Sequence, residues 1–222
     1  MRQNSNRIPS NQQGPALLRK VCGMRAPDNI AALLNLEPDF LGFIFYPGST
    51  RYVGETLAPA ALQHLPGRTK KVGVFVNARE DEILAAVTTY QLEAVQLHGE
   101  EKPELCRQLR KQGLLVFKAF PVDDDFDFGS LKPYEGSCDY YLFDTKGQQY
   151  GGNGTAFNWE ILKEYTGTTP FFLSGGIGPE HAGLINSLSL PALKGIDINS
   201  RFEISPALKD VGKVAAFFKE LN

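Results

Sequence analysis

The apolar positions of the 222-residue chain form eight short runs, and the stretches between most of these runs have helical spacing. Each run is apolar nearly throughout instead of alternating with polar residues, which is typical of strands covered on both faces in a parallel sheet. Successive runs begin 20 to 31 positions apart, which leaves room for a strand, a helix and two loops. We therefore expect strands at 17–22, 40–45, 71–76, 94–97, 114–119, 140–143, 171–174 and 195–198.

Helical spacing occurs at 26–36, 80–90, 103–112, 157–165 and 179–187, and again near the C-terminal end at 211–221. Some of these segments begin with residues typical of helix starts, namely Pro27-Asp28, Asn77 with Glu80 three positions later, and Pro179-Glu180. Strand and helix alternate to the end of the chain. This order predicts an α/β fold in which residues 17–222 form a single (β/α)8 TIM barrel.

An open, doubly wound sheet is the alternative architecture. It would favour a glycine-rich GxGxxG turn after the first strand, whereas residues 22–27 read Cys-Gly-Met-Arg-Ala-Pro. Residues 1–16 belong to neither architecture, because they are rich in Asn, Gln, Ser and Pro and contain almost nothing to bury. We expect them to form a disordered N-terminal extension.

Composition narrows the class of partner. A formal charge of −2 and a pI near 6.0 give no basic surplus, so nucleic acid and anionic membranes are not expected partners. Three cysteines without CxxC spacing and three scattered histidines indicate neither a disulfide framework nor a metal site, and we expect no cofactor. No apolar run has the length of a spanning helix. These features predict a cytoplasmic protein, and the sequence leaves open whether it is a monomer or a homodimer.

Polar residues gather where the expected strands end. In a (β/α)8 barrel the active site lies at the C-terminal ends of the strands. The residues at these ends are Cys22, Phe45 with the loop to Arg51, Asn77, His98, Phe120, Asp144, Gly175-Gly176 and Asp197. We expect the site among them.

Two segments could form a phosphate site. Residues 175–178 read Gly-Gly-Ile-Gly after the seventh strand, and residues 197–200 read Asp-Ile-Asn-Ser after the eighth. These two loops commonly bind phosphate in this fold, because glycine lets backbone N–H groups approach phosphate oxygens. The alternative is that Gly175 and Gly176 only form a tight turn.

Asp144 is a candidate general acid, because a carboxyl group at an apolar strand end can have a raised pKa. It precedes a loop, 147–154, that contains four glycines and could close over the site. A helix cap or a salt bridge to Lys146 is the structural alternative.

Cys22 is a candidate base or nucleophile if Lys20, Arg25 or a helix N-terminus lowers the pKa of its thiol. Its alternative role is that of a small buried hydrophobic residue, which is the role we assign to Cys106 and Cys138.

Arg51 could hold a carboxylate through two hydrogen bonds, or it could be a solvated surface residue. His98, which follows Gln96 at the end of the fourth strand, could bind substrate or fix the next loop. The acidic residues at 123–127 are expected to form a solvated loop, because they lack the spacing of an EF-hand.

Several motifs, in order, resemble the phosphoribosylanthranilate isomerase family, the (β/α)8 barrels of the tryptophan pathway. The resemblance runs from Lys20 to the C-terminal end. It is carried by Lys20–Met24, Gly42–Pro47 with Ser49, Arg51 and Tyr52, Val95–Gly99, Phe143–Lys146 with Gly151–Gly154, Phe157–Trp159, Leu173–Ile177 and Gly195–Asp197.

The resemblance implies an Amadori rearrangement of a small phosphorylated substrate, with Cys22 as the general base and Asp144 as the general acid. It further implies that Arg51 holds the anthranilate carboxylate and that Gln96 and His98 contact the substrate. The implied phosphate site contains Gly175, Gly176 and Ser200, with Asp197 positioning it.

One position departs from the family pattern. The family commonly has Ser-Ser-Gly-x-Glu after the eighth strand, whereas residues 199–203 read Asn-Ser-Arg-Phe-Glu. Arg201 in place of glycine could hinder the approach of the backbone to phosphate, or its guanidinium could meet an anionic group itself. Two rival functions are an epimerase of the ribulose-phosphate type, which would require more histidine, and a non-catalytic barrel that binds a phosphorylated metabolite.

Overall fold

The computed structural model describes residues 16–54, 56–63, 65, 67–147 and 157–221. The expected N-terminal extension lies outside the described residues except for Ala16, and so does most of the glycine-rich loop, including Gly151–Gly154.

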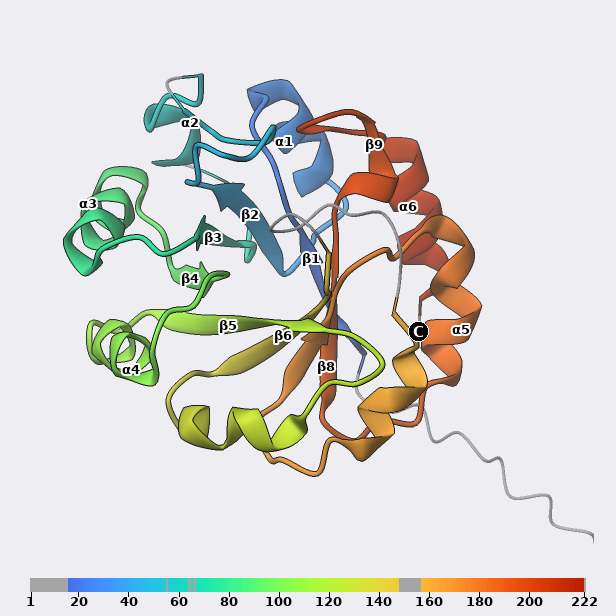
Figure 1. Ribbon diagram of the computed structural model, residues 1–222. Coiled ribbons are helices and arrows are strands. Elements are labelled where there is room, and N and C mark those ends of the chain that lie inside the picture. The colour runs from blue at the N-terminus through green and yellow to red at the C-terminus, as the bar shows by residue number, and fades with distance from the viewer. Residues whose placement is uncertain (1–15, 55, 64, 66, 148–156, 222) are drawn as a thin grey trace, which may run out of the picture.

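Eight parallel strands close into a barrel in chain order, which confirms the predicted fold (Figure 1). The barrel closes where the last strand pairs with the first, with Lys20 opposite Asp197. The strands are β1 Leu18–Val21, β2 Phe40–Ile44, β3 Lys70–Phe75, β4 Ala94–Leu97, β5 Leu115–Val122, β6 Tyr140–Thr145, β7 Phe171–Leu173 and β8 Leu193–Ile198.

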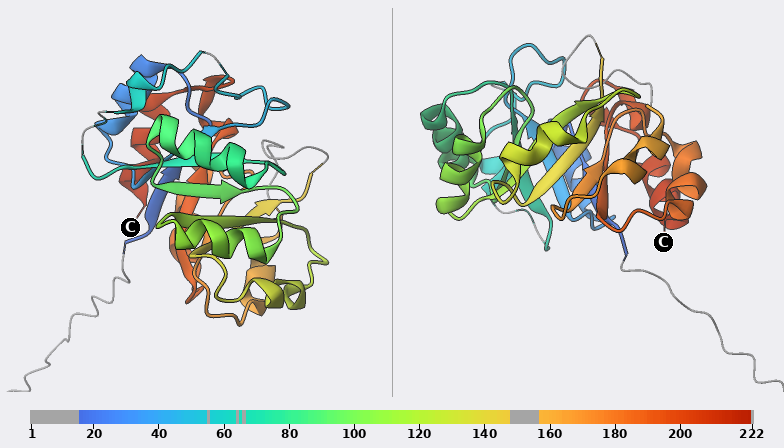
Figure 2. Two further views of the ribbon diagram at one scale, coloured as in Figure 1. Left: turned by 90° about the vertical axis from the view of Figure 1, so that its left-hand side faces the viewer. Right: turned by 60° about the horizontal axis from the view of Figure 1, so that its bottom comes forward.

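Helices surround the barrel in all three views (Figures 1 and 2). The α-helices are α1 Pro27–Leu34, α2 Ala60–Gln63, α3 Glu80–Tyr90, α4 Pro103–Lys111, α5 Ala182–Ser187 and α6 Val211–Glu220. The 3-10 helices are η1 Phe128–Tyr134, η2 Trp159–Glu164, η3 Pro179–His181 and η4 Ser200–Phe202. None of the helices in the described residues has the length and apolar character needed to cross a lipid bilayer.

Three helices, α2, η1 and η4, lie in segments for which no helix was expected, and two of the expected helices differ in type. The segment expected to be helical at 157–165 is the 3-10 helix η2, and the segment expected at 179–187 begins as η3 and becomes α-helical only at Ala182. Pro179 at the first position of η3 has the fixed φ that a helix start needs, as predicted.

Asn77 does not begin α3, contrary to the prediction. The helix starts at Glu80, and the N–H of Arg79 donates to the carboxylate of Glu82 at 2.9 Å. Asn77 has a left-handed φ of 51°, and its side-chain oxygen accepts from the N–H of Glu100. Its side chain therefore holds the loop after β4 rather than the end of a helix.

Aromatic rings fill the half of the barrel interior that lies toward the N-terminal ends of the strands. Phe117 lies at its centre, with its ring centroid 5.2 Å from those of both Phe40 and Phe172. Because side chains alternate along a strand, the residue two positions after each interior residue also faces inward, one layer closer to the C-terminal end. Asp144 follows Leu142 in this way, and Ser174 follows Phe172. The apolar layer therefore lies directly beneath Asp144 and Ser174, which belong to the next layer toward the C-terminal ends of the strands.

A hairpin that the sequence analysis did not predict lies between the barrel and α6. Its strands, β9 Glu203–Ser205 and β10 Leu208–Lys209, pair antiparallel next to η4. The hairpin places Glu203 and Lys209 near the open end of the barrel, where they join the site described below.

Gly195 allows β8 to lie close to its neighbours. A Cβ at this position would lie 2.6 Å from the carbonyl oxygen of Leu18 and 2.5 Å from the ring of Phe172. We expect Gly195→Ala to lower the free energy of unfolding by about 1–3 kcal/mol, as overpacking does. Gly183→Ala, at an exposed position of α5 with open space around it, should be neutral or stabilising. Urea denaturation of the two variants tests this, and equal stabilities would contradict it.

Candidate active site

A pocket of about 60 Å³ lies at the C-terminal ends of the strands. It brings together most of the residues expected there: Cys22, His98, Asp144, Gly175, Gly176, Asp197 and Ser200. The remaining lining comes from residues that were not singled out as site residues: Ile44, Tyr46, Ser49, Val74, Val76, Ser174, Ile177 and Asn199. The lining therefore combines apolar and polar side chains.

Two of the expected strand-end residues lie elsewhere. The ring of Phe120 packs edge-on against Tyr134 and Tyr141, away from the pocket. The Asn77 side chain binds the loop after β4, as described above.

A larger groove of about 680 Å³ lies between α1 and α2, at the N-terminal ends of the strands. Its lining contains charged residues such as Glu37, Asp39 and Arg68, and the described residues contribute no cysteine or histidine to it. The pocket at the other end combines a thiol, an imidazole, carboxyl groups and a glycine loop, so its chemistry favours it as the site despite its smaller size.

Asp144 at the end of β6 has two close polar neighbours. Its Oδ2 lies 3.2 Å from Nε2 of His98, and its Oδ1 accepts from the N–H of Thr145 at 3.0 Å. Its alternative partner, Lys146, is bound to Asp123 instead. Asp144 is also no helix cap, and only 7% of it is exposed. The carboxyl group is therefore directed into the pocket beside an imidazole.

Gln96 orients His98 from below. Its Nε2 lies 2.7 Å from Nδ1 of His98, and the residue is buried beneath the pocket without lining it. With this assignment of the amide, Nδ1 accepts and the imidazole proton lies on Nε2, the nitrogen next to Asp144. Gln96 thus fixes the ring of His98 beside the carboxyl group of Asp144.

Cys22 lies immediately after β1, and only 4% of it is exposed. Its N–H donates to the carbonyl of Ile198 at 2.9 Å. Gly42 on the neighbouring strand provides room for the thiol, because a Cβ there would lie 2.7 Å from Sγ. The thiol is therefore fixed at the seam between β1 and its neighbours.

The pKa of the Cys22 thiol is set by opposing effects. Burial raises it above the ordinary value, while the nearby cations of Lys20 and Lys209 lower it less strongly. Arg25, which was also considered, donates instead to the carbonyl of Tyr52 at 3.3 Å. The free protein therefore carries a thiol at neutral pH, with two ammonium groups nearby to stabilise the thiolate once it forms.

Lys20 and Asp197 form a buried ion pair directly behind Cys22, with Nζ 2.8 Å from Oδ2. Burial lowers the pKa of Lys20, but the attraction of Asp197 and Cys22 outweighs it and the net pKa is raised. Lys20 therefore stays charged. Asp197 lines the floor of the pocket, and its other oxygen has no partner among the described residues.

The glycine loop after β7 presents unpaired donors to the pocket. Gly175 and Gly176 have left-handed φ values of 81° and 64°. A Cβ at Gly175 would lie 2.3 Å from the backbone nitrogen of Thr145, so only glycine fits against the end of β6. Within the described part of the chain, no acceptor faces the N–H groups of Gly175, Gly176 and Ser200. Such converging N–H groups suit an anion.

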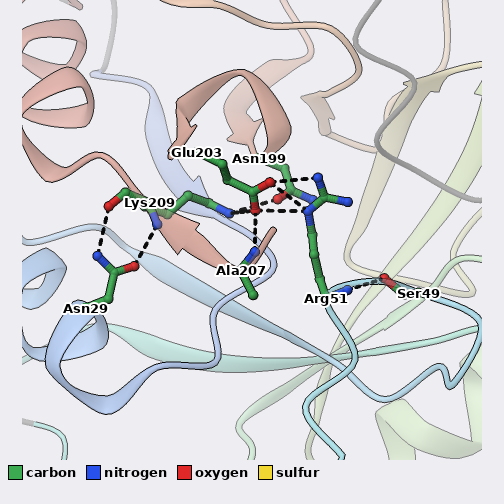
Figure 3. A network of polar contacts seen from close by, with 7 residues as sticks. All are labelled: Asn29, Ser49, Arg51, Asn199, Glu203, Ala207 and Lys209. Carbon is green, nitrogen blue, oxygen red and sulfur yellow. Dashed lines mark hydrogen bonds and ion pairs between the residues drawn. The ribbon is translucent and has the colours of Figure 1, made fainter. Parts of the chain in front are cut away.

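Arg51 does not line the pocket itself, but its side chain lies near Asn199, which does (Figure 3). It is not a solvated surface residue, because its side chain is only 14% exposed and it is paired with Glu203. Arg201, the residue that departs from the family pattern, forms an ion pair with Glu180 at the start of η3. It lies beside the glycine loop without lining the pocket.

Sequence analysis missed Glu203, Lys209 and Asn199 as site residues. Glu203 was visible as the last residue of the Asn-Ser-Arg-Phe-Glu segment, but no role was assigned to it. In the described residues, no cluster of three or more His, Cys, Asp or Glu side chains could hold a metal ion.

Known proteins are similar to this chain in sequence and in fold. The family model described as N-(5'-phosphoribosyl)anthranilate (PRA) isomerase matches residues 19–220. The enzyme of that name from Parabacteroides distasonis is 46% identical over 209 residues, covering 92% of this chain and 93% of the relative.

Two solved structures of other proteins are similar to this chain in fold, and one of them contains a bound ligand. A phosphoribosylanthranilate isomerase in complex with reduced 1-(o-carboxyphenylamino)-1-deoxyribulose 5-phosphate has a TM-score of 0.78 and 32% identity, covering 92% of this chain and 97% of the other. A monomeric form generated from the dimeric enzyme of Thermotoga maritima has a TM-score of 0.76 and 31% identity, with coverage of 92% and 97%.

The buried pair behind Cys22 gives a stability test. Lys20→Met should lower the free energy of unfolding by about 3–5 kcal/mol, because it leaves Asp197 as a buried charge without its partner. Combining it with Asp197→Leu removes both charges and should recover much of the loss. Chemical denaturation measures both variants. A single variant within about 1 kcal/mol of the wild type, a loss typical of an exposed pair, would contradict a strongly coupled pair.

Proposed function

Because the chain belongs to the N-(5'-phosphoribosyl)anthranilate isomerase family, we propose that its pocket converts N-(5-phosphoribosyl)anthranilate into 1-(2-carboxyphenylamino)-1-deoxyribulose 5-phosphate. This is the Amadori rearrangement of tryptophan biosynthesis. Family membership removes the two rival readings, the epimerase and the non-catalytic barrel. The observation that carries the proposal is that one pocket is lined by a carboxyl group, a thiol and a glycine loop whose backbone N–H groups have no acceptor among the described residues.

Ring opening is the first step. Asp144, whose carboxyl group lies beside the imidazole of His98, is the general acid that protonates the ring oxygen of the phosphoribosyl group. The C1–O bond breaks, and the nitrogen lone pair forms a Schiff base at C1. The imidazole of His98, held by Gln96, lies beside this carboxyl group, so the two residues position the acid and do not act on the carbon that reacts.

Proton transfer from carbon is the second step. Cys22, as the thiolate, removes the proton at C2, and the electrons move toward the iminium nitrogen to give an enolamine. The enolamine then becomes the ketone as C1 gains a proton and the hydroxyl group on C2 loses one. Lys20 and Lys209 stabilise the thiolate, because a cation near a thiol favours its ionised form.

The substrate is anchored at both ends. The N–H groups of Gly175, Gly176 and Ser200 bind the phosphate, and Asp197 supports this floor through its pair with Lys20. Arg51 beside the pocket binds the anthranilate carboxylate. Two fixed anchors hold the reacting carbons between Asp144 and Cys22.

Assembly and location are finer proposals. We expect a monomer or a homodimer, supported by the related enzyme of Thermotoga maritima, which is described as dimeric. We place the enzyme in the cytoplasm, where the intermediates of amino-acid biosynthesis are made. Light scattering of the purified protein decides the assembly.

The general-acid role is tested with Asp144→Asn, which keeps the size of the side chain but removes its transferable proton. Consumption of phosphoribosylanthranilate, followed by its fluorescence, should fall by about 10²–10⁴-fold. Asp123→Asn is the matched control, because it removes an exposed carboxylate that pairs with Lys146 at the end of the neighbouring strand. A wild-type protein that does not consume the substrate would overturn the function. Asp144→Asn turnover within about tenfold of wild type would overturn the role of the acid.

The general-base role is tested with Cys22→Ser, which should reduce kcat by at least about 100-fold because a hydroxyl does not ionise near neutral pH. Burial raises the pKa of the Cys22 thiol, so the thiolate fraction, and with it wild-type kcat/KM, should increase as the pH rises toward that pKa. Cys106→Ser, a buried cysteine in α4, is the control. A pH profile of Cys22→Ser that matches the wild type would contradict the role of the base.

A further inference from the structure

We infer that Glu203 is a positioning residue that holds Arg51 by one edge of its guanidinium group, so that the opposite edge faces the carboxylate of the substrate. This inference rests on the proposed function and extends it to a residue on the β9–β10 hairpin. It assigns a task to a carboxylate that neither lines the pocket nor touches the reacting atoms.

The guanidinium of Arg51 is engaged along one edge only. Its Nε donates to Oε1 of Glu203 at 2.9 Å, and its Nη2 donates to Oε2 at 2.7 Å. Nη1 points away from Glu203 (Figure 3), and none of the described residues accepts from it. A planar guanidinium has a second edge, formed by Nη1 and the outer N–H of Nη2, that can bind another carboxylate with two hydrogen bonds.

Glu203 is itself fixed from the other side. Its side chain is only 5% exposed, and Oε1 also accepts from Nζ of Lys209 at 2.6 Å and from the N–H of Ala207 at 3.1 Å. Burial raises the pKa of Glu203, but Arg51 and Lys209 outweigh it, so the net pKa is lowered. Glu203 is therefore a rigid, ionised acceptor at neutral pH.

Lys209 connects this acceptor to the rest of the site. Its backbone N–H and carbonyl both bind the side chain of Asn29 in α1, at 2.8 and 2.9 Å. Its Nζ also donates to Oδ1 of Asn199 at 2.9 Å, and Asn199 lines the pocket next to Ser200 of the proposed phosphate site. The network thus links the two proposed anchors of the substrate (Figure 3).

The aliphatic part of the Arg51 side chain packs against Gly23, the residue after Cys22. A Cβ at Gly23 would lie 2.8 Å from Cδ of Arg51 and 2.7 Å from Oδ1 of Asn199. Gly23 has a left-handed φ of 76°, so glycine suits this position for two separate reasons. The arginine crosses the chain directly beside Cys22, which fixes the spacing between the proposed carboxylate anchor and the base.

The charges of the network complement an anionic ligand. Arg51 and Lys209 carry two positive charges and Glu203 carries one negative charge, which leaves a formal charge of +1 beside the pocket. One carboxylate from the substrate would make the group neutral. Without Glu203 the two cations would repel each other, and the guanidinium would have no fixed direction.

The test is Glu203→Gln, which keeps the shape of the side chain and removes its charge. We expect KM for phosphoribosylanthranilate to rise by about tenfold, with kcat within about twofold of wild type, because substrate and transition state lose the same contact. Arg51→Ala should raise KM at least as much. Adding Glu203→Gln to Arg51→Ala should change nothing further, because Glu203 acts through Arg51. Glu104→Gln, in an exposed pair with Arg107, is the control.

A second measurement separates positioning from a general loosening of the hairpin. Reduced product analogue, which carries the carboxylate, should bind Glu203→Gln more weakly, while inhibition by inorganic phosphate should not change. A purely structural role would weaken both. Glu203→Asp, which keeps the charge on a shorter side chain, replaces Glu203→Gln if that variant does not fold, and the same rise in KM is expected.

The outcomes distinguish this inference from the proposed function. A wild-type protein that does not consume phosphoribosylanthranilate would overturn both. An active wild type overturns the inference alone if KM is unchanged in the Glu203 variant, if the effects of the Arg51 and Glu203 variants add, or if phosphate and the analogue are weakened equally.

Discussion

The ion pair between Lys20 and Asp197 is the interaction on which the site depends. It joins β1 to β8 where the barrel closes, and both side chains are buried, so neither charge is stable without the other. The same register places Cys22 two residues after Lys20 and Asn199 two residues after Asp197, both at the pocket. Closure of the barrel therefore sets the position of the proposed base, its nearest cation and the start of the proposed phosphate loop.

A common arrangement recurs around the pocket. Two of the proposed functional groups, Asp144 and Arg51, are each held by a neighbouring side chain of the protein. His98 orients Asp144, and Glu203 orients Arg51, while Gln96 and Lys209 in turn fix these two supports. Such support reduces the conformational freedom that substrate binding would otherwise remove. The apolar layer of Phe40, Phe117 and Phe172 beneath gives the arrangement a rigid base.

The sequence was sufficient to predict the barrel and most of the pocket, because both follow from local periodicity. Eight apolar runs marked the strands, and the residues that end these runs marked the candidate site. The β9–β10 hairpin could not be predicted, because two strands of two and three residues leave no periodic signal. The pair of Arg51 with Glu203 spans 152 positions, a distance over which one sequence carries no information about contact. Asn77 was misassigned because an Asn followed by Glu resembles a helix start, whereas its left-handed backbone binds the next loop.

A crystal structure of the wild-type protein with the reduced product analogue would test the account most directly. The account predicts that the phosphate binds the N–H groups of Gly175, Gly176 and Ser200, and that the carboxylate binds Nη1 of Arg51 while Glu203 keeps the other edge. The sugar carbons would then lie between Asp144 and Cys22. An analogue bound in the groove between α1 and α2, or reversed so that its phosphate meets Arg51, would contradict it.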